Sequence, residues 1–326
     1  MILVGVDAMG GDFAPAEVVK GVNLAIAKNK EIEINLYGDQ DQILKYLIPH
    51  ERVHIIHTPD FVDMGEKDPI KVVRHNKSAS IILAMNDLRD KKIDALVSGG
   101  PTQVIMVGGY IIVKRAEGMR RIALAPFIPS PDGRKRIILD TGGNVTLEPI
   151  DLVDFGRHAT IVAKTLLGID NPKCALLNIG TEPGKGREFD KEAFKLLEDQ
   201  KEFNFIGNIE SKELFTTEAD IILQDGWTNN IAIKSLEGTA KTMANVLKKE
   251  IMSSLWGKIG YLFMRKNLER FKEDFNTLKV GGAMILGLNG IVVKSHGSSN
   301  QETFFQAILQ AADLVSKDVL NLINRQ

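Results

Sequence analysis

Short apolar strands that end abruptly in glycine and polar residues recur along the chain, and a stretch of helical periodicity usually follows each one. Strands that are apolar throughout are covered by helices on both faces, which is typical of a mainly parallel sheet. Ligands of such sheets bind beyond the carboxyl ends of the strands, where these polar turns fall. The pattern predicts an α/β fold with a site built from several loops. Its seven copies, each a strand with the polar turn that ends it, lie at residues 2–7, 34–39, 95–100, 137–144, 174–182, 221–226 and 291–297.

Two further tracts carry helical signals. Residues 104–113 form the longest apolar run, which is too short to span a bilayer and indicates a buried helix. Residues 239–280 have helical periodicity without strand signals and predict a helical hairpin that projects from the sheet. No repeat or Pro/Ser-rich linker divides the chain, so we expect one α/β unit over residues 1–326. One face of the hairpin fits an interfacial membrane helix and a subunit interface equally well: Trp256, Ile259, Leu262 and Phe263, with Lys258, Arg265 and Lys266 beside it.

The net charge and the cysteine count limit the kinds of partner and the cellular compartment that we expect. The 41 Lys and Arg residues against 42 Asp and Glu give a formal net charge of −1, so no overall basic field indicates nucleic acid or anionic lipid. The single cysteine, Cys174, excludes an intrachain disulfide and fits a reducing compartment, so we expect a cytoplasmic protein. Six scattered histidines show no metal-ligand spacing, and we expect neither a metal nor a cofactor.

The first strand ends in Asp7-Ala-Met-Gly-Gly-Asp12, where the backbone N–H groups of Gly10 and Gly11 could approach an anion at a helix start. The alternative is a plain strand-to-helix turn in which Asp12 caps the helix. Ser98-Gly-Gly-Pro-Thr102 repeats the arrangement after another strand, and Ser98, Gly99 and Thr102 add two hydroxyls and flexible backbone. Neither loop is a Walker loop or a dinucleotide fingerprint.

Further polar groups follow other strands. Lys71, Arg74, His75 and Lys77 stand at helical spacing and would suit an acidic substrate, although a solvated helix face is the commoner explanation. His296 could donate a hydrogen bond to an oxyanion, and Ser298 or Ser299 could cap the last helix. Lysines and carboxylates at two strand ends indicate either a site or a structural ion pair: Asn178, Glu182 and Lys185 in one loop, and Asp225, Asn230, Lys234 and Glu237 in the other.

Taken together, these strings closely resemble the PlsX family of acyl-ACP:phosphate acyltransferases, in order and over essentially the whole chain. The matching strings are Asp7-Ala-Met-Gly-Gly-Asp12 with Ala14-Pro15, Asn178-Ile-Gly-Thr-Glu-x-x-Lys-Gly186, Asn204-Phe-Ile-Gly-Asn-Ile-Glu210, Asp225-Gly-x-Thr-x-Asn230 with Lys234-x-x-Glu-Gly238, Gly281-Gly-Ala283 and His296-Gly-Ser-Ser299.

The resemblance implies a three-layer α/β/α fold with a mixed, mostly parallel sheet and two intertwined subdomains, similar to the isocitrate and isopropylmalate dehydrogenases and the phosphotransacetylases. It also implies a homodimer, with the 239–280 hairpin in dimer contact, peripheral membrane contact or both. The implied reaction passes a long-chain acyl group from acyl carrier protein (ACP) to inorganic phosphate. The acyl phosphate then serves phospholipid synthesis.

For this reaction we expect backbone N–H groups of Gly10, Gly11 and Gly99, with Lys185 or Lys234, to hold phosphate. Asn230 or His296 would polarise the thioester carbonyl. The remaining residues expected at the substrate site are Asp7, Asp12, Ser98, Thr102, Asn144, Asn178, Glu182, Asp225 and Ser298.

Three loops depart from the family pattern. Relatives typically show Ser-Ala-Gly-Asn-Thr-Gly at Ser98–Gln103, Gly-Ala-Asn at Gly142–Asn144 and Gly-Phe-Thr-Gly-Asn at Gly226–Asn230. These departures keep two alternatives open, a CoA-dependent or acetyl-phosphate-forming relative and a weakly active acyl-ACP-binding protein. A dehydrogenase of related fold ranks last, because no nucleotide fingerprint is visible.

Overall fold

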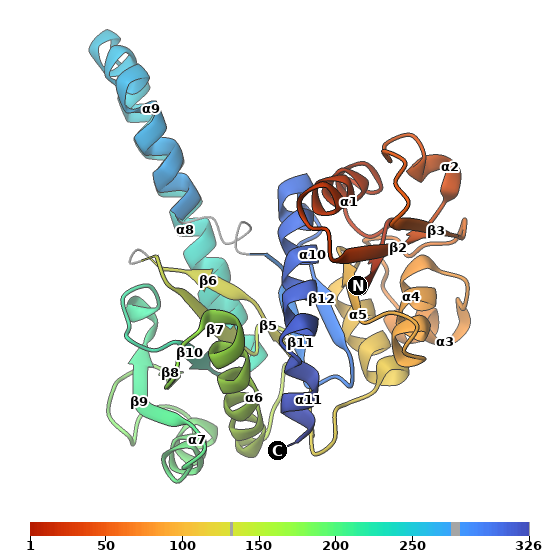
Figure 1. Ribbon diagram of the computed structural model, residues 1–326. Coiled ribbons are helices and arrows are strands. Elements are labelled where there is room, and N and C mark those ends of the chain that lie inside the picture. Colours follow the sequence, from red (N-terminus) through yellow and green to blue (C-terminus); the bar gives the residue numbers. More distant parts are fainter. Residues whose placement is uncertain (131–132, 275–280, 326) are drawn as a thin grey trace.

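The computed structural model describes residues 1–130, 133–274 and 281–325, with the backbone alone for residues 268–274. Its strands form two sheets, each largely parallel (Figure 1). In the described part of the chain, the first sheet has seven strands: β3 (Val53–His57), β2 (Ile32–Gly38), β1 (Ile2–Asp7), β4 (Ala95–Ser98), β12 (Ile291–Lys294), β11 (Ala283–Leu286) and β5 (Ala123–Ala125), in that order. The second has β6 (Phe127–Pro129), β7 (Lys135–Leu139), β10 (Ile221–Leu223), β8 (Lys173–Asn178) and β9 (Asn204–Glu210).

The first sheet lies between two helical layers, as its continuous apolar strands require. Alternate residues of one strand face opposite layers: Val293 packs in the core cluster that contains α1 (Ala16–Lys28) and α10 (Gln301–Ser316), whereas Val292 packs with α4 (Ser80–Arg89) and α5 (Thr102–Gly108). A π-helix over Gly109–Val113 continues α5. The helix predicted over residues 104–113 is therefore confirmed, with a change of helix type partway, and it is mostly buried, although Tyr110 and Ile111 are exposed. Two short helices also belong to this half, α2 (Gln40–Ile43) and α3 (Pro69–His75), whereas α11 (Val319–Asn324) packs against both α10 and α6 (Pro149–Leu167).

The second sheet is also covered on both faces. Leu176 packs with α6 (Pro149–Leu167) and α7 (Glu188–Glu198), while its neighbour Leu177 faces Ile233 on α8 (Gly226–Met252). A 3₁₀ turn over Ser211–Glu213 follows β9. The chain passes between the sheets at Pro126, the residue between β5 and β6, and one core cluster is shared by both halves. The predicted α/β fold with mostly parallel strands is confirmed, although the strands are divided between two sheets.

All seven strands of the sequence pattern are present, and each ends within a few residues of its predicted polar turn. The pattern missed β3, β5, β6, β9 and β11. Among these, β6 and β11 run antiparallel to their neighbours, and β5 and β6 have only three residues each. Such short segments carry too few residues for a periodic signal.

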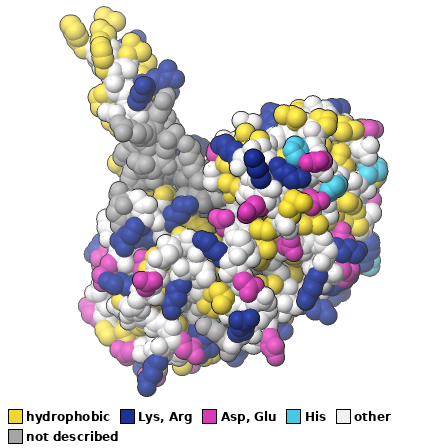
Figure 2. All heavy atoms as spheres, in the orientation of Figure 1, with side chains coloured by type: hydrophobic (Ala, Val, Ile, Leu, Met, Phe, Trp, Pro, Cys, Tyr) yellow, Lys and Arg dark blue, Asp and Glu magenta, His cyan; other side chains and the backbone are white. Residues whose placement is uncertain are grey.

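The outer part of α8 and α9 (Leu255–Asp274) project away from both sheets (Figure 1). The tract predicted from residue 239 is the outer part of this pair, because α8 already begins at Gly226; residues 275–280 of the tract lie outside the described residues. Trp256 and Phe263 are 83% and 86% exposed, and Figure 2 shows hydrophobic side chains gathered at the outer end of the projection. None of the helices in the described part of the chain has the length and apolar composition needed to cross a bilayer.

Candidate active site

The loops after β1, β4 and β12 meet at one edge of the first sheet, because these three strands are adjacent and parallel. The Asp12 N–H donates to the Gly297 carbonyl over 2.8 Å, and the Ser295 N–H donates to the Ser98 carbonyl over 2.8 Å. Gly11 has φ of +132°, in the region that favours glycine. The predicted glycine loops and the His296 loop are thus one contiguous surface of backbone.

Buried Asp7 holds this surface in place through hydrogen bonds. Only 2% of it is exposed, and its carboxylate accepts hydrogen bonds from the Ser80 and Ser98 hydroxyls at 2.6 and 2.7 Å. Burial raises the pKa of Asp7, while those two hydrogen bonds and a third from the Met9 N–H lower it. The contacts hold the loops after β1 and β4 together, and Ser80, the start of α4, is a partner that the sequence pattern did not indicate.

Close packing of the two glycine loops leads to a stability prediction. A methyl group on Gly99 would lie 2.6 Å from the Gly10 carbonyl oxygen and 2.7 Å from the Phe304 ring, so we expect Gly99→Ala to destabilise the protein by about 1–3 kcal/mol in urea unfolding. Gly238→Ala, on α8 with no atom within 4 Å of the added group, is the matched control and should stabilise it by about 0.5–1 kcal/mol. Equal midpoints for the two variants would contradict the packing described.

The helix that follows the first loop does not use the predicted cap. Pro15, not Asp12, is the residue at the N-cap of α1, and no side chain caps that helix. The last long helix, α10, is capped by Asn300, whose side chain accepts from the Thr303 N–H, and not by Ser298 or Ser299. Asp12 and Ser298 are exposed. Both therefore remain accessible to a ligand.

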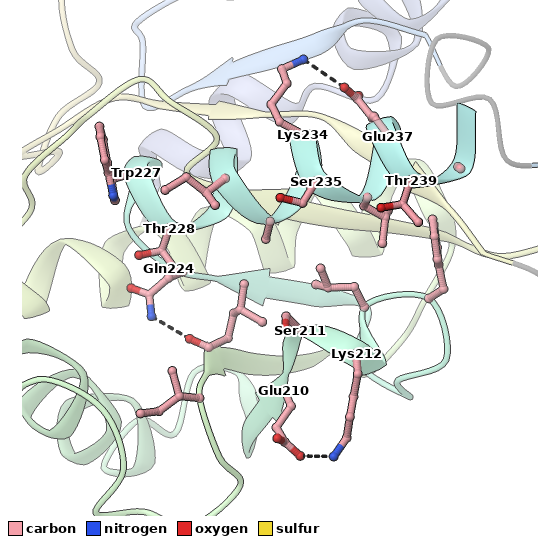
Figure 3. Close-up of a pocket in the computed structure, with 18 of the residues that line it drawn as sticks. Glu210, Ser211, Lys212, Gln224, Trp227, Thr228, Lys234, Ser235, Glu237 and Thr239 are labelled. Atoms are coloured by element: carbon pink, nitrogen blue, oxygen red, sulfur yellow. Dashed lines mark hydrogen bonds and ion pairs between the residues drawn. The ribbon is translucent and has the colours of Figure 1, made fainter. Parts of the chain in front are cut away.

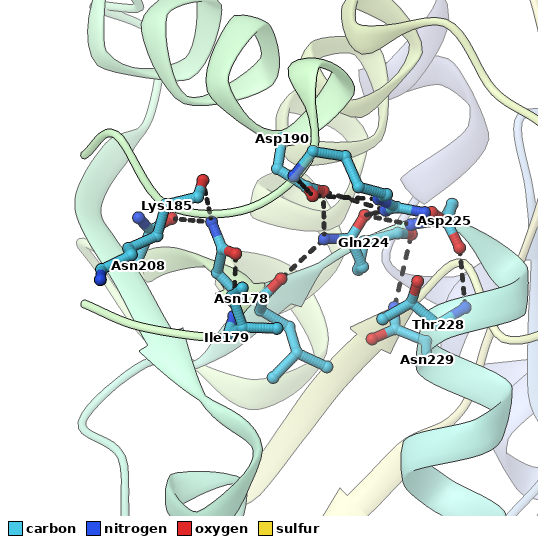
Figure 4. A network of polar contacts seen from close by, with 11 residues as sticks. Asn178, Ile179, Lys185, Asp190, Asn208, Gln224, Asp225, Thr228 and Asn229 are labelled. Carbon is cyan, nitrogen blue, oxygen red and sulfur yellow. Dashed lines mark hydrogen bonds and ion pairs between the residues drawn. The ribbon is translucent and has the colours of Figure 1, made fainter. Parts of the chain in front are cut away.

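A polar network organises the carboxyl edge of the second sheet (Figure 4). Arg187 donates to Asp190 at 2.9 Å and to Asp225 at 2.6 Å, and Gln224 donates to the Leu177 carbonyl and to Asp190. Burial alone would raise the pKa of Asp190, but its hydrogen bonds and charge contact with Arg187 outweigh burial and hold that pKa below its ordinary value. Asp225 also caps α8 by accepting from the Thr228 N–H.

The loop after β8 is shaped through its backbone. Asn178 donates to the Lys185 carbonyl and to Asn208 (Figure 4). Asn208 in turn donates to the Glu182 carbonyl. The side chains of Glu182 and Lys185 remain about half exposed or more, 3.9 Å apart. Asn178 therefore supports the loop, whereas Glu182 and Lys185 present their charges to solvent.

Three other predicted residues flank these loops. Asn144 donates to the Ile122 carbonyl and to Asp140. Asn230 is exposed beside Gly142, and Thr102 is half-buried as the first residue of α5.

Helix α8 links the two edges. It starts at the end of β10 in the second sheet and carries Lys234 and Glu237, paired at 3.0 Å, to the vicinity of His296 beyond the first sheet. Burial lowers the pKa of His296, and the nearby Lys294 and Lys234 lower it further, which favours the neutral ring at neutral pH. The Ser298 N–H donates to Nδ1 of His296, so the proton of the neutral ring lies on Nε2.

A groove of about 1930 Å³ runs along α8 (Figure 3). The Lys234–Glu237 pair lies across it from the Glu210–Lys212 pair (Figure 3). Of the four residues predicted to be catalytic, Lys234 and His296 are among the described residues that line the groove, whereas Lys185 and Asn230 are not. Much of the remaining lining is apolar: Leu177, Ile179, Leu214, Phe215, Trp227, Ile231, Leu236, Met243 and Leu247.

Sequence reasoning missed two charged residues at these edges, Arg187 and Lys294. Lys294 ends the otherwise apolar strand β12, and a lysine that interrupts such a strand is a usable signal. Arg187 follows the matched Lys185-Gly186 string by one residue, and only the folded loop shows that it pairs with Asp225, which lies 38 residues away in sequence.

Comparison with known proteins identifies the family and supports the fold. A family model described as "Fatty acid synthesis protein" matches residues 2–322. The chain is 43% identical to the phosphate acyltransferase of Acholeplasma laidlawii over 325 residues, covering 99% of this chain and 97% of that protein. It is 40% identical to the phosphate acyltransferase of Bacillus cereus (strain G9842) over 321 residues, covering 98% and 97%.

Solved structures of phosphotransacetylases have a similar fold. A phosphotransacetylase from Streptococcus pyogenes matches with a TM-score of 0.62 at 16% identity, over 97% of this chain and 94% of that one, which confirms the predicted phosphotransacetylase-like fold. The sequence identity to the two phosphate acyltransferases extends over nearly the whole chain and therefore identifies the family as well as the fold. By that agreement, the chain belongs to the PlsX family of phosphate acyltransferases, which act in fatty acid and phospholipid synthesis.

Proposed function

We propose that this protein transfers a long-chain acyl group from ACP to inorganic phosphate and releases acyl phosphate. One observation carries the proposal: an anion-binding arrangement of glycine loops and cations lies beside a large, mainly apolar groove, and Lys234 and His296 line that groove. The loops suit phosphate, and the groove suits an alkyl chain.

The chemistry needs no covalent intermediate. A phosphate oxygen attacks the thioester carbonyl carbon, the C–S bond breaks, and the thiolate leaves with the electron pair and takes a proton from solvent. Phosphate is already an anionic nucleophile at neutral pH. The protein must therefore supply position and charge stabilisation.

The proposed roles follow from placement. Backbone N–H groups of Gly11 and Gly99 would bind phosphate oxygens, whereas the Gly10 N–H already donates to the Asp7 carbonyl at 3.4 Å, and Lys234 would add a positive charge from α8. Lys185 is a weaker candidate than Lys234, because it lies outside the groove lining. The Nε2–H of His296 would donate to the oxyanion that forms on the thioester carbonyl, a role for which Asn230 is less well placed.

The projecting helices support two further proposals. The exposed Trp256, Leu262 and Phe263 on α9 suit a homodimer contact or peripheral contact with a membrane surface. Sedimentation with and without anionic vesicles would separate these uses.

A donor series tests the function. We expect thiol release from palmitoyl-ACP in the presence of phosphate, with acyl phosphate as the product. Each methylene buried in the groove should raise kcat/KM about fourfold until the groove is filled, so palmitoyl-ACP should exceed octanoyl-ACP by at least about tenfold. Acetyl-CoA and palmitoyl-CoA are the matched donors without ACP.

Two results would overturn the proposal in different ways. Faster turnover of acetyl-CoA than of palmitoyl-ACP would indicate the CoA-dependent alternative. Binding of palmitoyl-ACP without thiol release would indicate an acyl-ACP-binding protein.

A further inference from the structure

Lys294 is a buried lysine without a counter-ion. It is the last residue of β12 and only 8% exposed. Its ammonium donates to the Ser295 carbonyl at 2.8 Å, and no carboxylate of the described residues lies within ion-pair distance. An ammonium has three N–H donors, so two of them have no protein acceptor in the described residues.

Such an arrangement is costly in a protein interior. Buried lysines are almost always paired, because removing the charge from water is unfavourable unless an opposite charge and hydrogen bonds replace the water. Burial lowers the pKa of Lys294 to about 8, with the nearby Lys234 acting in the same direction and Asp12 opposing it. The site therefore holds an ammonium that an anionic ligand would stabilise.

The charged groups around Lys294 come from three parts of the chain. Asp12 faces it from the loop after β1, Lys234 from α8, and His296 from its own loop, while Glu237 is already paired with Lys234. Two lysines thus converge, one from β12 and one from α8, and Asp12 is the one carboxylate near Lys294 without a lysine or arginine partner among the described residues. An oxyanion between the lysines would accept hydrogen bonds from the N–H donors of Lys294 that have no acceptor among the described residues.

We propose that Lys294 binds the phosphate group of the substrate and of the acyl phosphate product, with Lys234 on its other side. This inference rests on the proposed function, because it assigns the phosphate subsite of the same reaction. The ligand class is a phosphate or equivalent tetrahedral oxyanion. Its neighbours are the N–H groups of the glycine loop after β1, which lies against the His296 loop.

The proposal requires a pH dependence of phosphate binding. The ammonium binds phosphate and the neutral amine does not, so affinity should fall about tenfold between pH 7 and pH 9 as Lys294 loses its proton near pH 8. His296, with its lowered pKa, stays neutral over this range. Phosphate itself only gains negative charge as pH rises, so its own titration does not explain a weakening.

The test uses the full chain and three variants. For Lys294→Met we expect KM for phosphate to rise about tenfold or more, with KM for palmitoyl-ACP unchanged. Lys294→Arg keeps a charge at all these pH values and should lose the decline in phosphate affinity above pH 8. Lys173→Met is the matched control. Lys173 is the first residue of β8, at the end of that strand away from the site loops, and it pairs with Glu218.

Phosphate binding is measured independently of turnover by equilibrium dialysis of labelled inorganic phosphate. A lower melting temperature with unchanged phosphate KM and phosphate binding would mean that Lys294 is only structural, and the inference would be overturned. If Lys294→Met does not fold, an unaltered pH dependence in Lys294→Arg would overturn it equally. If wild-type protein binds phosphate through Lys294 but releases no thiol, the proposed function fails while the subsite stands.

Discussion

Replacing His296 with alanine is expected to lower kcat with palmitoyl-ACP about 10²–10³-fold, the loss typical of removing one oxyanion donor. The Ser298 N–H holds Nδ1 as an acceptor, so the ring directs its single N–H elsewhere, and the ring lines the groove. The oxyanion forms only as phosphate attacks, so KM for either substrate should change little. Steady-state thiol release at saturating phosphate measures the effect.

Two variants sharpen the assignment of His296. His54→Ala removes a histidine that is half exposed on β3 and paired with Glu33, and it should leave kcat unchanged. His296→Gln offers an amide N–H and should recover part of the loss. If His296→Ala raised KM for phosphate without lowering kcat, His296 would be a binding group and not an oxyanion donor.

The second large effect concerns stability. Arg187→Met should lower the free energy of unfolding by about 2–4 kcal/mol in urea at pH 7, because it leaves the carboxylates of Asp190 and Asp225 unpaired, each only 4% exposed. Lys191→Met, which removes a pair with the 91% exposed Glu188 side chain on the same helix, should change it by no more than about 0.5 kcal/mol.

The Arg187 effect should also depend on pH. The pKa of Asp190 is lower in the folded protein than its ordinary value of 3.8, so its stabilisation is present above pH 3.8 and is lost as the pH falls through the folded pKa. In Arg187→Met that lowering disappears. The stability difference between wild type and variant should therefore be largest near neutral pH and shrink below pH 4. A constant difference from pH 7 to pH 3 would contradict an ionic origin.

The positions of the site loops were predictable because each follows a run of apolar residues that can only be a buried strand. Once β1, β4 and β12 are parallel neighbours, the loops containing Gly10, Gly99 and His296 must share an edge. The sequence pattern was therefore sufficient to bring together residues nearly 300 positions apart. It needed no knowledge of side-chain contacts.

What the pattern could not show depends on burial and register. Asp7 was expected at the substrate site. Its carboxylate oxygens accept hydrogen bonds from two serine hydroxyls, which the packing of α4 and β4 brings next to it. Likewise, the interaction of Arg187 with Asp225 requires the loop geometry after β8. That no carboxylate of the described residues pairs with Lys294 is a property of its surroundings, which no local sequence signal records.

Helix α8 is continuous from the site to the projecting end of the molecule, so its two ends are mechanically connected. Its fulcrum is the capped first turn at Asp225, Lys234 lies about 12 Å along the axis, and the outer end at Met252 lies about 39 Å along it. A tilt that carries the outer end sideways by about 3 Å therefore displaces the backbone at Lys234 by about 1 Å. A misplacement of about 1 Å is enough to change the rate of a positioned reaction by about 10²-fold. If α8 tilted as a rigid body about this turn, the displacement at Lys234, which we propose binds phosphate, would be about one third of the displacement at the outer end.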